Sequence, residues 1–254
     1  MKKHFLFLSF LAALLILLVS CGKSSLTTTP EKVGLSSDTL ALADQFMQEF
    51  VDSGKWAGIA ALVMKDDKIV YREQFGYASI KDSLPLEEHA IFRIFSMTKP
   101  ITAVALMTLY DEGKFQLDDK LSRYIPGFAD VMVYDPEAKA LEPQVDELTI
   151  RHLLTHTSGI VYGWGQSYVD SLYRVTGVGN WDSASIGDKV KIMTTLPLKS
   201  QPGTRWEYGL SIDVAGYLVE VLSGIPLDEY FRTRIFEPLE MEDTGFYVPQ
   251  EKQD

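Results

Sequence analysis

The stretch FSMTKP at residues 95–100 places a serine and a lysine three residues apart, immediately before a long apolar segment. On a helix, positions i and i+3 lie on one face, about one turn apart. Ser96 needs a base to act as a nucleophile, and the spacing sets it beside the amine of Lys99. The Ser-x-x-Lys pattern alone is weak, because any chain this long contains a few by chance. Its surroundings therefore decide what it means.

The segment that follows predicts a buried helix. Nearly every residue from 101 to 110 is apolar or small, which is typical of a helix covered on most sides. With Ser96 as its N-cap, Pro100 falls in the first turn, where a missing N–H leaves no intrahelical bond unmade. Gly113 is expected to end the helix.

Upstream, two apolar runs at 58–64 and 68–76 flank a short polar turn, which predicts a β-hairpin. A helix is expected over 36–51, with Ser36 or Ser37 as its N-cap. Residues 79–90 are expected to form a polar loop.

Downstream, helices alternate with irregular segments. Residues 131–147 are expected to be irregular, and the Gly-, Tyr- and Trp-rich segment 160–185 shows no clear periodicity. Its Tyr162 and Trp164 are open to two interpretations, a substrate-facing wall or loop packing. Asp213 and Glu220 are expected to face solvent. The predicted helices are 149–154, 186–195, 211–222 and 227–235.

Composition sets limits on function. With 46% hydrophobic and 23% charged residues, the chain suits one sizeable domain. Its formal charge of -11 argues against a nucleic-acid partner, since phosphates need a basic face. A single cysteine, Cys21, excludes an intrachain disulfide. His152 and His156 have an i, i+4 spacing that metal sites use, but no glutamate lies between them, and no metal or cofactor is expected.

The N-terminus predicts an export signal. Residues 1–20 hold two lysines followed by an apolar run that is short for a membrane span of about 20 residues. The run ends in LVSC, which resembles the bacterial lipoprotein signal, with Cys21 as the lipidated residue. The alternative is an ordinary cleavage site before a free cysteine. Residues 21–34 suit a flexible tether, so a membrane-anchored protein, periplasmic or at the cell surface, is expected.

Five segments occur in a telling order: FRIFSMTKP at 92–100, EGKFQLDD at 112–119, IRHLLTHTSG at 150–159, PG at 202–203 with WEY at 206–208, and IFEPL at 235–239. Together they resemble the serine β-lactamase and penicillin-binding protein superfamily, on its class C-like side of esterases and DD-peptidases. The resemblance implies an α+β, β-lactamase/transpeptidase-like domain at 35–254, with an antiparallel sheet and a helical sub-domain.

The resemblance also implies roles. Ser96 would be the nucleophile, and Lys99 would supply or relay its base. Tyr208, which opens the family's Tyr-x-Asn motif, would share the proton transfer, because a nearby cation favours the charged form of a phenol. The backbone N–H of Ser96 would stabilise the oxyanion. An acyl-enzyme would form and water would release the acid.

Two departures from the family pattern matter. Leu210 occupies the position of the motif's asparagine. The loss of that asparagine favours ester over β-lactam hydrolysis, and the neighbouring Ser211 is expected to replace the asparagine in part. Leu210, Ser211 and Trp164 are thus the expected substrate contacts. The family's third motif, Lys- or His-x-Gly, does not follow Tyr208. A C-terminally truncated domain with only the N-terminal hairpin of its sheet is therefore expected.

Three functions stay open at this point. The first is a serine hydrolase of esters or amides, the second a D-alanyl-D-alanine carboxypeptidase acting on cell-wall peptides, and the third a non-catalytic, truncated lipoprotein. The sequence holds no Gly-x-Ser-x-Gly elbow, so an α/β-hydrolase would lack its nucleophile. The expected partners are a small ester, amide or peptide and, through Cys21, a membrane.

Overall fold

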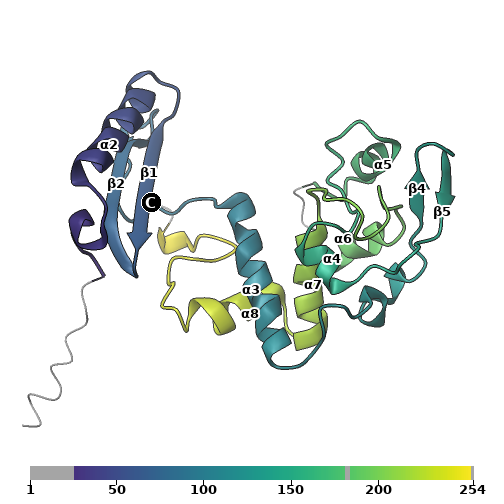
Figure 1. Ribbon diagram of the computed structural model, residues 1–254. Helices are drawn as coiled ribbons and strands as arrows, with labels where there is room; N and C mark the ends of the chain where they lie inside the picture. Colours follow the sequence, from purple (N-terminus) through teal and green to yellow (C-terminus); the bar gives the residue numbers. More distant parts are fainter. Residues whose placement is uncertain (1–25, 181–183, 253–254) are drawn as a thin grey trace, which may run out of the picture. The chain divides into compact units, whose positions relative to one another are not determined.

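The computed structural model describes residues 26–180 and 184–252, so Cys21 and the signal segment lie outside the described residues. The chain forms two compact units, residues 1–92 and 93–254, whose elements are labelled in Figure 1. Each is described by itself.

The first unit contains an antiparallel sheet with the order β1-β2-β3, formed by β1 (Gly58–Lys65), β2 (Lys68–Ser79) and β3 (Leu84–Pro85). Asp66 and Asp67 join β1 to β2 with φ angles of 52° and 57°. Two left-handed residues in a two-residue loop match the twist of the flanking strands. The predicted hairpin is confirmed, but the expected polar loop at 79–90 adds the short β3.

One helix, α2 (Ser37–Asp52), packs on this sheet. Ser36 is its N-cap and accepts a hydrogen bond from the N–H of Thr39, as predicted. The Tyr71 hydroxyl on β2 donates to the Asp44 carboxylate on α2. A short 3-10 helix, η1 (Pro30–Val33), precedes α2.

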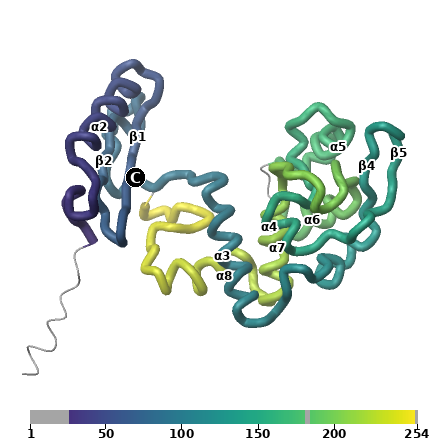
Figure 2. Tube along the Cα trace, in the orientation of Figure 1, coloured from purple at the N-terminus to yellow at the C-terminus, as the bar shows by residue number. Residues whose placement is uncertain are grey.

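The second unit is mainly helical. In Figure 2, the segment that links α3 (Thr98–Asp111) to α7 (Ser211–Ser223) lies on the α7 side of this helix pair, and the segment after α7 lies on the α3 side. Its α-helices are α3 (Thr98–Asp111), α4 (Ile150–Leu154), α5 (Tyr168–Thr176), α6 (Ile186–Met193), α7 (Ser211–Ser223) and α8 (Leu227–Phe231). The other elements are η2 (Phe95–Met97), η3 (Leu121–Arg123), η4 (Pro126–Phe128), β4 (Val133–Asp135), β5 (Ala140–Glu142), the π-helical η5 (Arg232–Phe236) and η6 (Gln250–Lys252).

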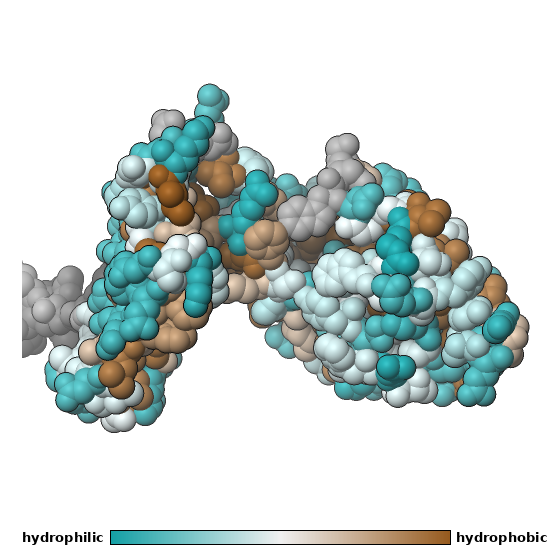
Figure 3. Space-filling view, turned by 90° about the horizontal axis from the view of Figure 1, so that it is seen from above, coloured by the Kyte–Doolittle hydropathy of each residue, from teal (hydrophilic) through white to brown (hydrophobic). Residues whose placement is uncertain are grey.

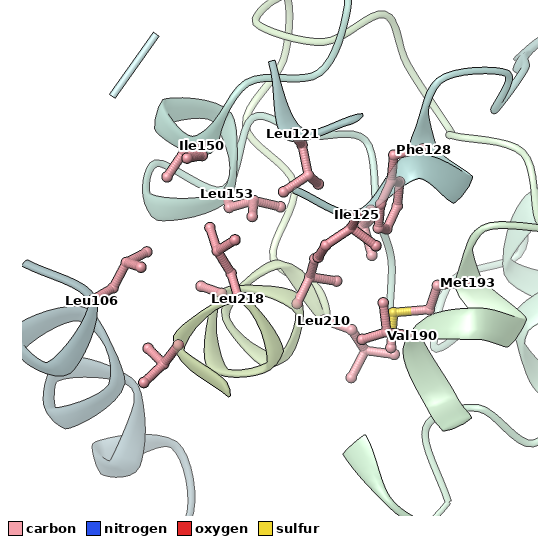
Figure 4. Packing of buried hydrophobic residues seen from close by; sticks show 14 of the residues in the cluster. Leu106, Leu121, Ile125, Phe128, Ile150, Leu153, Val190, Met193, Leu210 and Leu218 are labelled. Carbon is pink, nitrogen blue, oxygen red and sulfur yellow. The ribbon is translucent and has the colours of Figure 1, made fainter. Parts of the chain in front are cut away.

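Helix α7 lies at the centre of the core, in contact with α3, α4, α6 and α8. Figure 4 shows Leu218 of α7 facing Leu153 of α4, with Leu106 of α3 nearby, and all three side chains are fully buried. Because α7 is mainly apolar, the helix can be covered on most sides. The helix ends at Gly224, whose left-handed φ of 78° suits a glycine C-cap.

Three predictions about local structure are wrong. Met97, and not Ser96, is the N-cap of α3, because the extra 3-10 turn η2 precedes the helix. Residues 131–147 contain the hairpin β4-β5. Segment 160–185 contains α5, whose Ser167 and Asp170 form a reciprocal capping box, a Ser-x-x-Asp signal that periodicity alone does not reveal.

The surfaces of both units carry apolar side chains, brown in Figure 3. Within the described ranges, none of the helices combines the length and apolar character that crossing a bilayer requires.

Candidate active site

Ser96 lies in the 3-10 turn that leads into α3. Phe95, just before it, has a φ of 44°, in a left-handed region that bulky residues rarely adopt. Such backbone strain gathers at functional sites, where the surrounding structure holds it. Ser96 is exposed, so its hydroxyl is accessible to a substrate.

Lys99 lies in the first turn of α3, one turn beyond the serine, and its Nζ donates to Ser96 Oγ at 3.1 Å. Burial lowers the pKa of Lys99, but the hydroxyls of Tyr162 and Tyr208 outweigh burial and raise the pKa above its usual value. Lys99 is therefore a cation at neutral pH and a donor toward Ser96.

Tyr208 reaches the same serine from 112 residues away, and its hydroxyl donates to Ser96 Oγ at 2.7 Å. Lys99 Nζ lies 4.9 Å from the centre of the Tyr208 ring. Its hydrogen bonds with Lys99, and then with Ser96, lower the pKa of Tyr208 against the opposing effect of burial. Burial instead raises the pKa of Tyr162. Of these two phenols, Tyr208 is the one suited to accept a proton.

The backbone on both sides of Tyr208 is tightly held. The N–H of Glu207 donates to the carbonyl of His156 at 2.8 Å. On the other side, a Cβ at Gly209 would lie 2.0 Å from the carbonyl oxygen of Ile160. Only glycine permits this approach of the two chains, so the residue after Tyr208 helps to fix where the phenol lies.

Aromatic rings line the surroundings of Tyr208, and we call Tyr162, Trp164 and Trp206 the aromatic wall. Tyr162 and Trp164 stack with centroids 4.2 Å apart and planes 6° apart. Trp164 and Trp206 are 74% and 64% exposed. The ring of His156 packs 5.0 Å from that of Tyr208. The wall offers flat apolar surface beside the serine.

Leu210 and Ser211 are closed off from a substrate, contrary to the expectation from the sequence. Leu210 is 5% exposed and belongs to the hydrophobic core. Ser211 is fully buried at the start of α7, and its hydroxyl forms a 2.7 Å hydrogen bond with that of Ser158. Among the three expected substrate contacts, Trp164 alone presents an accessible side chain.

Two features of the site are not predicted by the local sequence. Asp213 is only partly exposed, and burial raises the pKa of its carboxyl, although the charge of Lys99 opposes this. Glu220, also expected to be solvated, accepts the N–H of Leu227 at 2.9 Å. The second feature is a cluster of ion pairs around Lys199. No local pattern signals either, because isolated charged residues are normally solvated.

The two histidines at i and i+4 do not form a metal site. His152 Nδ1 accepts the N–H of Thr149 in the capping box of α4. His156 lies beyond that helix, with a φ of 53°, and packs on Tyr208. Within residues 26–180 and 184–252, no three His, Cys, Asp or Glu side chains are placed to hold a metal ion.

This arrangement can move a proton. An alcohol lies within hydrogen-bond reach of both a cation and a phenol of lowered pKa, which is how a weak nucleophile is activated. The serine precedes a helix N-terminus, where backbone N–H groups and the helix dipole favour negative charge. The α+β fold and the Ser-Lys-Tyr centre of the helical unit together define the class of protein to which this chain belongs.

The chain belongs to the beta-lactamase family, whose model matches residues 43–254. It is 32% identical over 222 residues to Esterase EstB of Burkholderia gladioli, covering 85% of this chain and 54% of that protein. It is also 32% identical over 262 residues to a putative D-alanyl-D-alanine carboxypeptidase of Escherichia coli (strain K12), covering 97% and 56%.

Among solved structures, the chain resembles EstCE1, a hydrolase with promiscuous acyltransferase activity, with a TM-score of 0.72 and 28% identity over 85% of this chain and 56% of that one. The chain spans about half the length of the curated relatives it matches. These comparisons confirm the predicted superfamily and the β-lactamase/transpeptidase-like α+β fold.

Proposed function

We propose that this chain carries the centre of a serine hydrolase that cleaves esters through an acyl-serine intermediate. The observation that supports this best is the joint contact of Ser96 Oγ with Lys99 Nζ at 3.1 Å and with the Tyr208 hydroxyl at 2.7 Å. The two partners differ in role, since the cation lowers the pKa of the phenol.

In the proposed first step, ionised Tyr208 takes the proton of Ser96 while Oγ attacks the ester carbonyl carbon. The Lys99 cation stabilises the phenolate, and the N–H of Ser96 donates to the oxyanion that develops. When the intermediate collapses, the bond to the alcohol breaks and the alcohol leaves with the proton from Tyr208. Water then gives its proton to Tyr208, attacks the acyl carbon and displaces Ser96, which regains that proton.

An ester fits this site better than a β-lactam or a peptide does. Leu210 presents no amide where the family motif has asparagine, and its side chain is buried. The exposed indole of Trp164 and the rest of the aromatic wall offer apolar contact. Apolar groups bind such surfaces without leaving polar atoms unpaired. The likeness to an esterase and to a hydrolase with acyltransferase activity supports the same choice.

A fluorophosphonate probe tests the proposal. We expect the 254-residue protein to be labelled at Ser96, as located by peptide mass spectrometry, and the Ser96→Ala variant to lose the label. Ser171→Ala is a matched control, because that hydroxyl only donates to the carbonyl of Tyr168. Equal labelling of wild type and Ser96→Ala would show the proposal to be wrong.

A carboxypeptidase is the alternative, favoured by the likeness to the putative D-alanyl-D-alanine carboxypeptidase. Release of D-alanine from a D-Ala-D-Ala peptide separates the two functions. We expect cleavage of p-nitrophenyl esters and no D-alanine release. Peptide cleavage faster than ester cleavage would favour the carboxypeptidase.

We also propose that the protein is exported and anchored through a lipid on Cys21, on the basis of the LVSC segment. The Cys21→Ala variant should then move from the membrane fraction to the soluble fraction. Unchanged partition into membranes would exclude the anchor.

A further inference from the structure

Lys199 is a charged residue of the second unit that has no part in the steps above. Its Nζ lies 2.7 Å from Glu207 Oε1 and 3.3 Å from Asp170 Oδ2. The three side chains are 23%, 22% and 3% exposed, respectively. Removing the cation would leave two partly desolvated carboxylates facing each other, which is strongly unfavourable. This cluster therefore holds together the segments that carry its members.

One of these segments carries the phenol. Glu207 immediately precedes Tyr208, and its backbone N–H donates to His156 at 2.8 Å. Its carboxylate is bound to Lys199 at the same time. The residue before Tyr208 is thus held by its backbone and by its side chain.

A second segment carries part of the aromatic wall. Asp170 accepts the N–H groups of Gly165 and Ser167, each at 3.2 Å, and the Ser167 hydroxyl at 2.5 Å. These bonds fold the loop around Trp164, which stacks on Tyr162. Through Asp170, the position of this loop also depends on Lys199.

The lysine itself stands on rigid backbone. Its N–H donates to the carbonyl of Gly159 at 2.9 Å. The preceding Leu198 is fully buried and donates its N–H to Met132 at 2.8 Å, in a bridge beside β4. Lys199 thus contacts both carboxylate-bearing segments from a backbone that is itself hydrogen-bonded.

We infer that Lys199 is a positioning residue that sets Tyr208 and the Trp164 loop in register around Ser96. Its ion pairs are with Glu207 and Asp170, and it acts on the site through them. The inference rests on the proposed function, because it assigns Lys199 to the same site. When Lys199 is removed, Tyr208 should withdraw from Lys99 and Ser96 and titrate at higher pH.

The test is the titration of Tyr208 by NMR with tyrosine labelled at 13Cζ, with Tyr208→Phe to assign the resonance. We expect Lys199→Met and Glu207→Gln both to move the titration to higher pH, and Lys199→Arg to restore it. Lys191→Met is the matched control, because Lys191 is an exposed lysine paired with Asp188 on α6. Labelling of Ser96 should fall roughly 10²-fold in the two disruptive variants, as for a displaced catalytic group.

The pair of variants distinguishes positioning from a simple change of charge. Loss of the Lys199 cation and loss of the Glu207 anion would shift the phenol in opposite directions if only their fields mattered. The groups that face Tyr208, which are Lys99, His156, Tyr162 and Asp213, stay unchanged. Opposite shifts, or no shift, would overturn the inference.

Two further outcomes are also decisive. If circular dichroism shows that Lys199→Met does not fold, Glu207→Gln, which keeps the Lys199–Asp170 pair, decides alone. Because the titration needs no turnover, it reports on positioning even if Ser96 is never labelled. Absence of labelling in wild type would count against the proposed function and not against this inference.

Discussion

The two units of the chain differ in how they bury apolar side chains. In the part described for the first unit, residues 26–92, the buried hydrophobic side chains are Val70 and Leu86. The second unit has one continuous core built around α7. All three proposed catalytic side chains belong to the second unit. The difference shows that the geometry around Ser96 is set by a unit with a core of its own.

Two tyrosines express the same contrast in chemical terms. Burial and the Asp44 carboxylate raise the pKa of Tyr71 in the first unit. Hydrogen bonding with Lys99 and Ser96 lowers the pKa of Tyr208 in the second unit. A carboxylate partner suppresses ionisation of a phenol and a cation favours it. The same side chain is therefore structural in one unit and suited to proton transfer in the other.

The largest expected effect comes from replacing one of these two tyrosines, Tyr208, with phenylalanine. Tyr208→Phe removes the proposed base and should slow fluorophosphonate labelling of Ser96 by about 10²- to 10⁴-fold. Tyr71→Phe loses only the bond to Asp44 and should label at the wild-type rate. The measurement is the labelling rate at saturating probe. Similar rates for the two variants would remove the distinction between the tyrosines.

An effect of intermediate size is expected on the free energy of unfolding when a leucine is truncated in each unit. Leu218→Ala on α7 empties a fully buried position and should lower the free energy of unfolding by about 2–5 kcal/mol. Leu62→Ala on β1 truncates a side chain that is 49% exposed and should change it by less than about 0.5 kcal/mol. Urea unfolding followed by circular dichroism measures both. Equal losses would contradict the contrast in packing.

The smallest effect concerns pH. Burial lowers the pKa of His152 and His156 in the second unit, so below the usual value of 6.5 the unfolded chain binds protons that the folded chain does not. Stability is then lost as pH falls from 7 through the lowered pKa values. His152→Gln keeps an acceptor for the α4 capping box and should make the fall of Tm between pH 7 and pH 5 shallower.

The exposed His89 of the first unit provides the control for this experiment. His89→Gln is the same substitution outside the helical core, and it should leave the dependence of Tm on pH as in wild type. If the Tm of His152→Gln depended on pH as the wild-type Tm does, the burial of His152 would not contribute to the pH dependence of stability.

Local pattern predicted much of the fold and only part of the site. The turn between Ser96 and Lys99 follows from helical spacing, and the hairpin follows from two apolar runs around Asp66 and Asp67. Tyr208 could be joined to them only through a family motif, since no local rule spans 112 residues. The helix α5 was missed because its signal is a capping pair and not an apolar period.

The errors at the site have a common physical origin. Ser211 is expected to replace the motif's asparagine because it is the next polar residue, but the first turn of α7 points it into the core, where Ser158 satisfies it. Local pattern does not single out Lys199, because its partners lie 8 and 29 residues away in sequence. Polarity at one position does not reveal whether the group meets water, a substrate or another charge.

The contact between Gly209 and Ile160 has a consequence for how this sequence can vary. Even one methyl group at position 209 would lie 2.0 Å from a backbone oxygen. Only the hydrogen atom of glycine is small enough to fit between these two backbone segments. In a saturation library at position 209 that is sorted by Ser96 labelling, glycine should be recovered nearly alone. The site thus depends on the absence of a side chain as much as on those that are present.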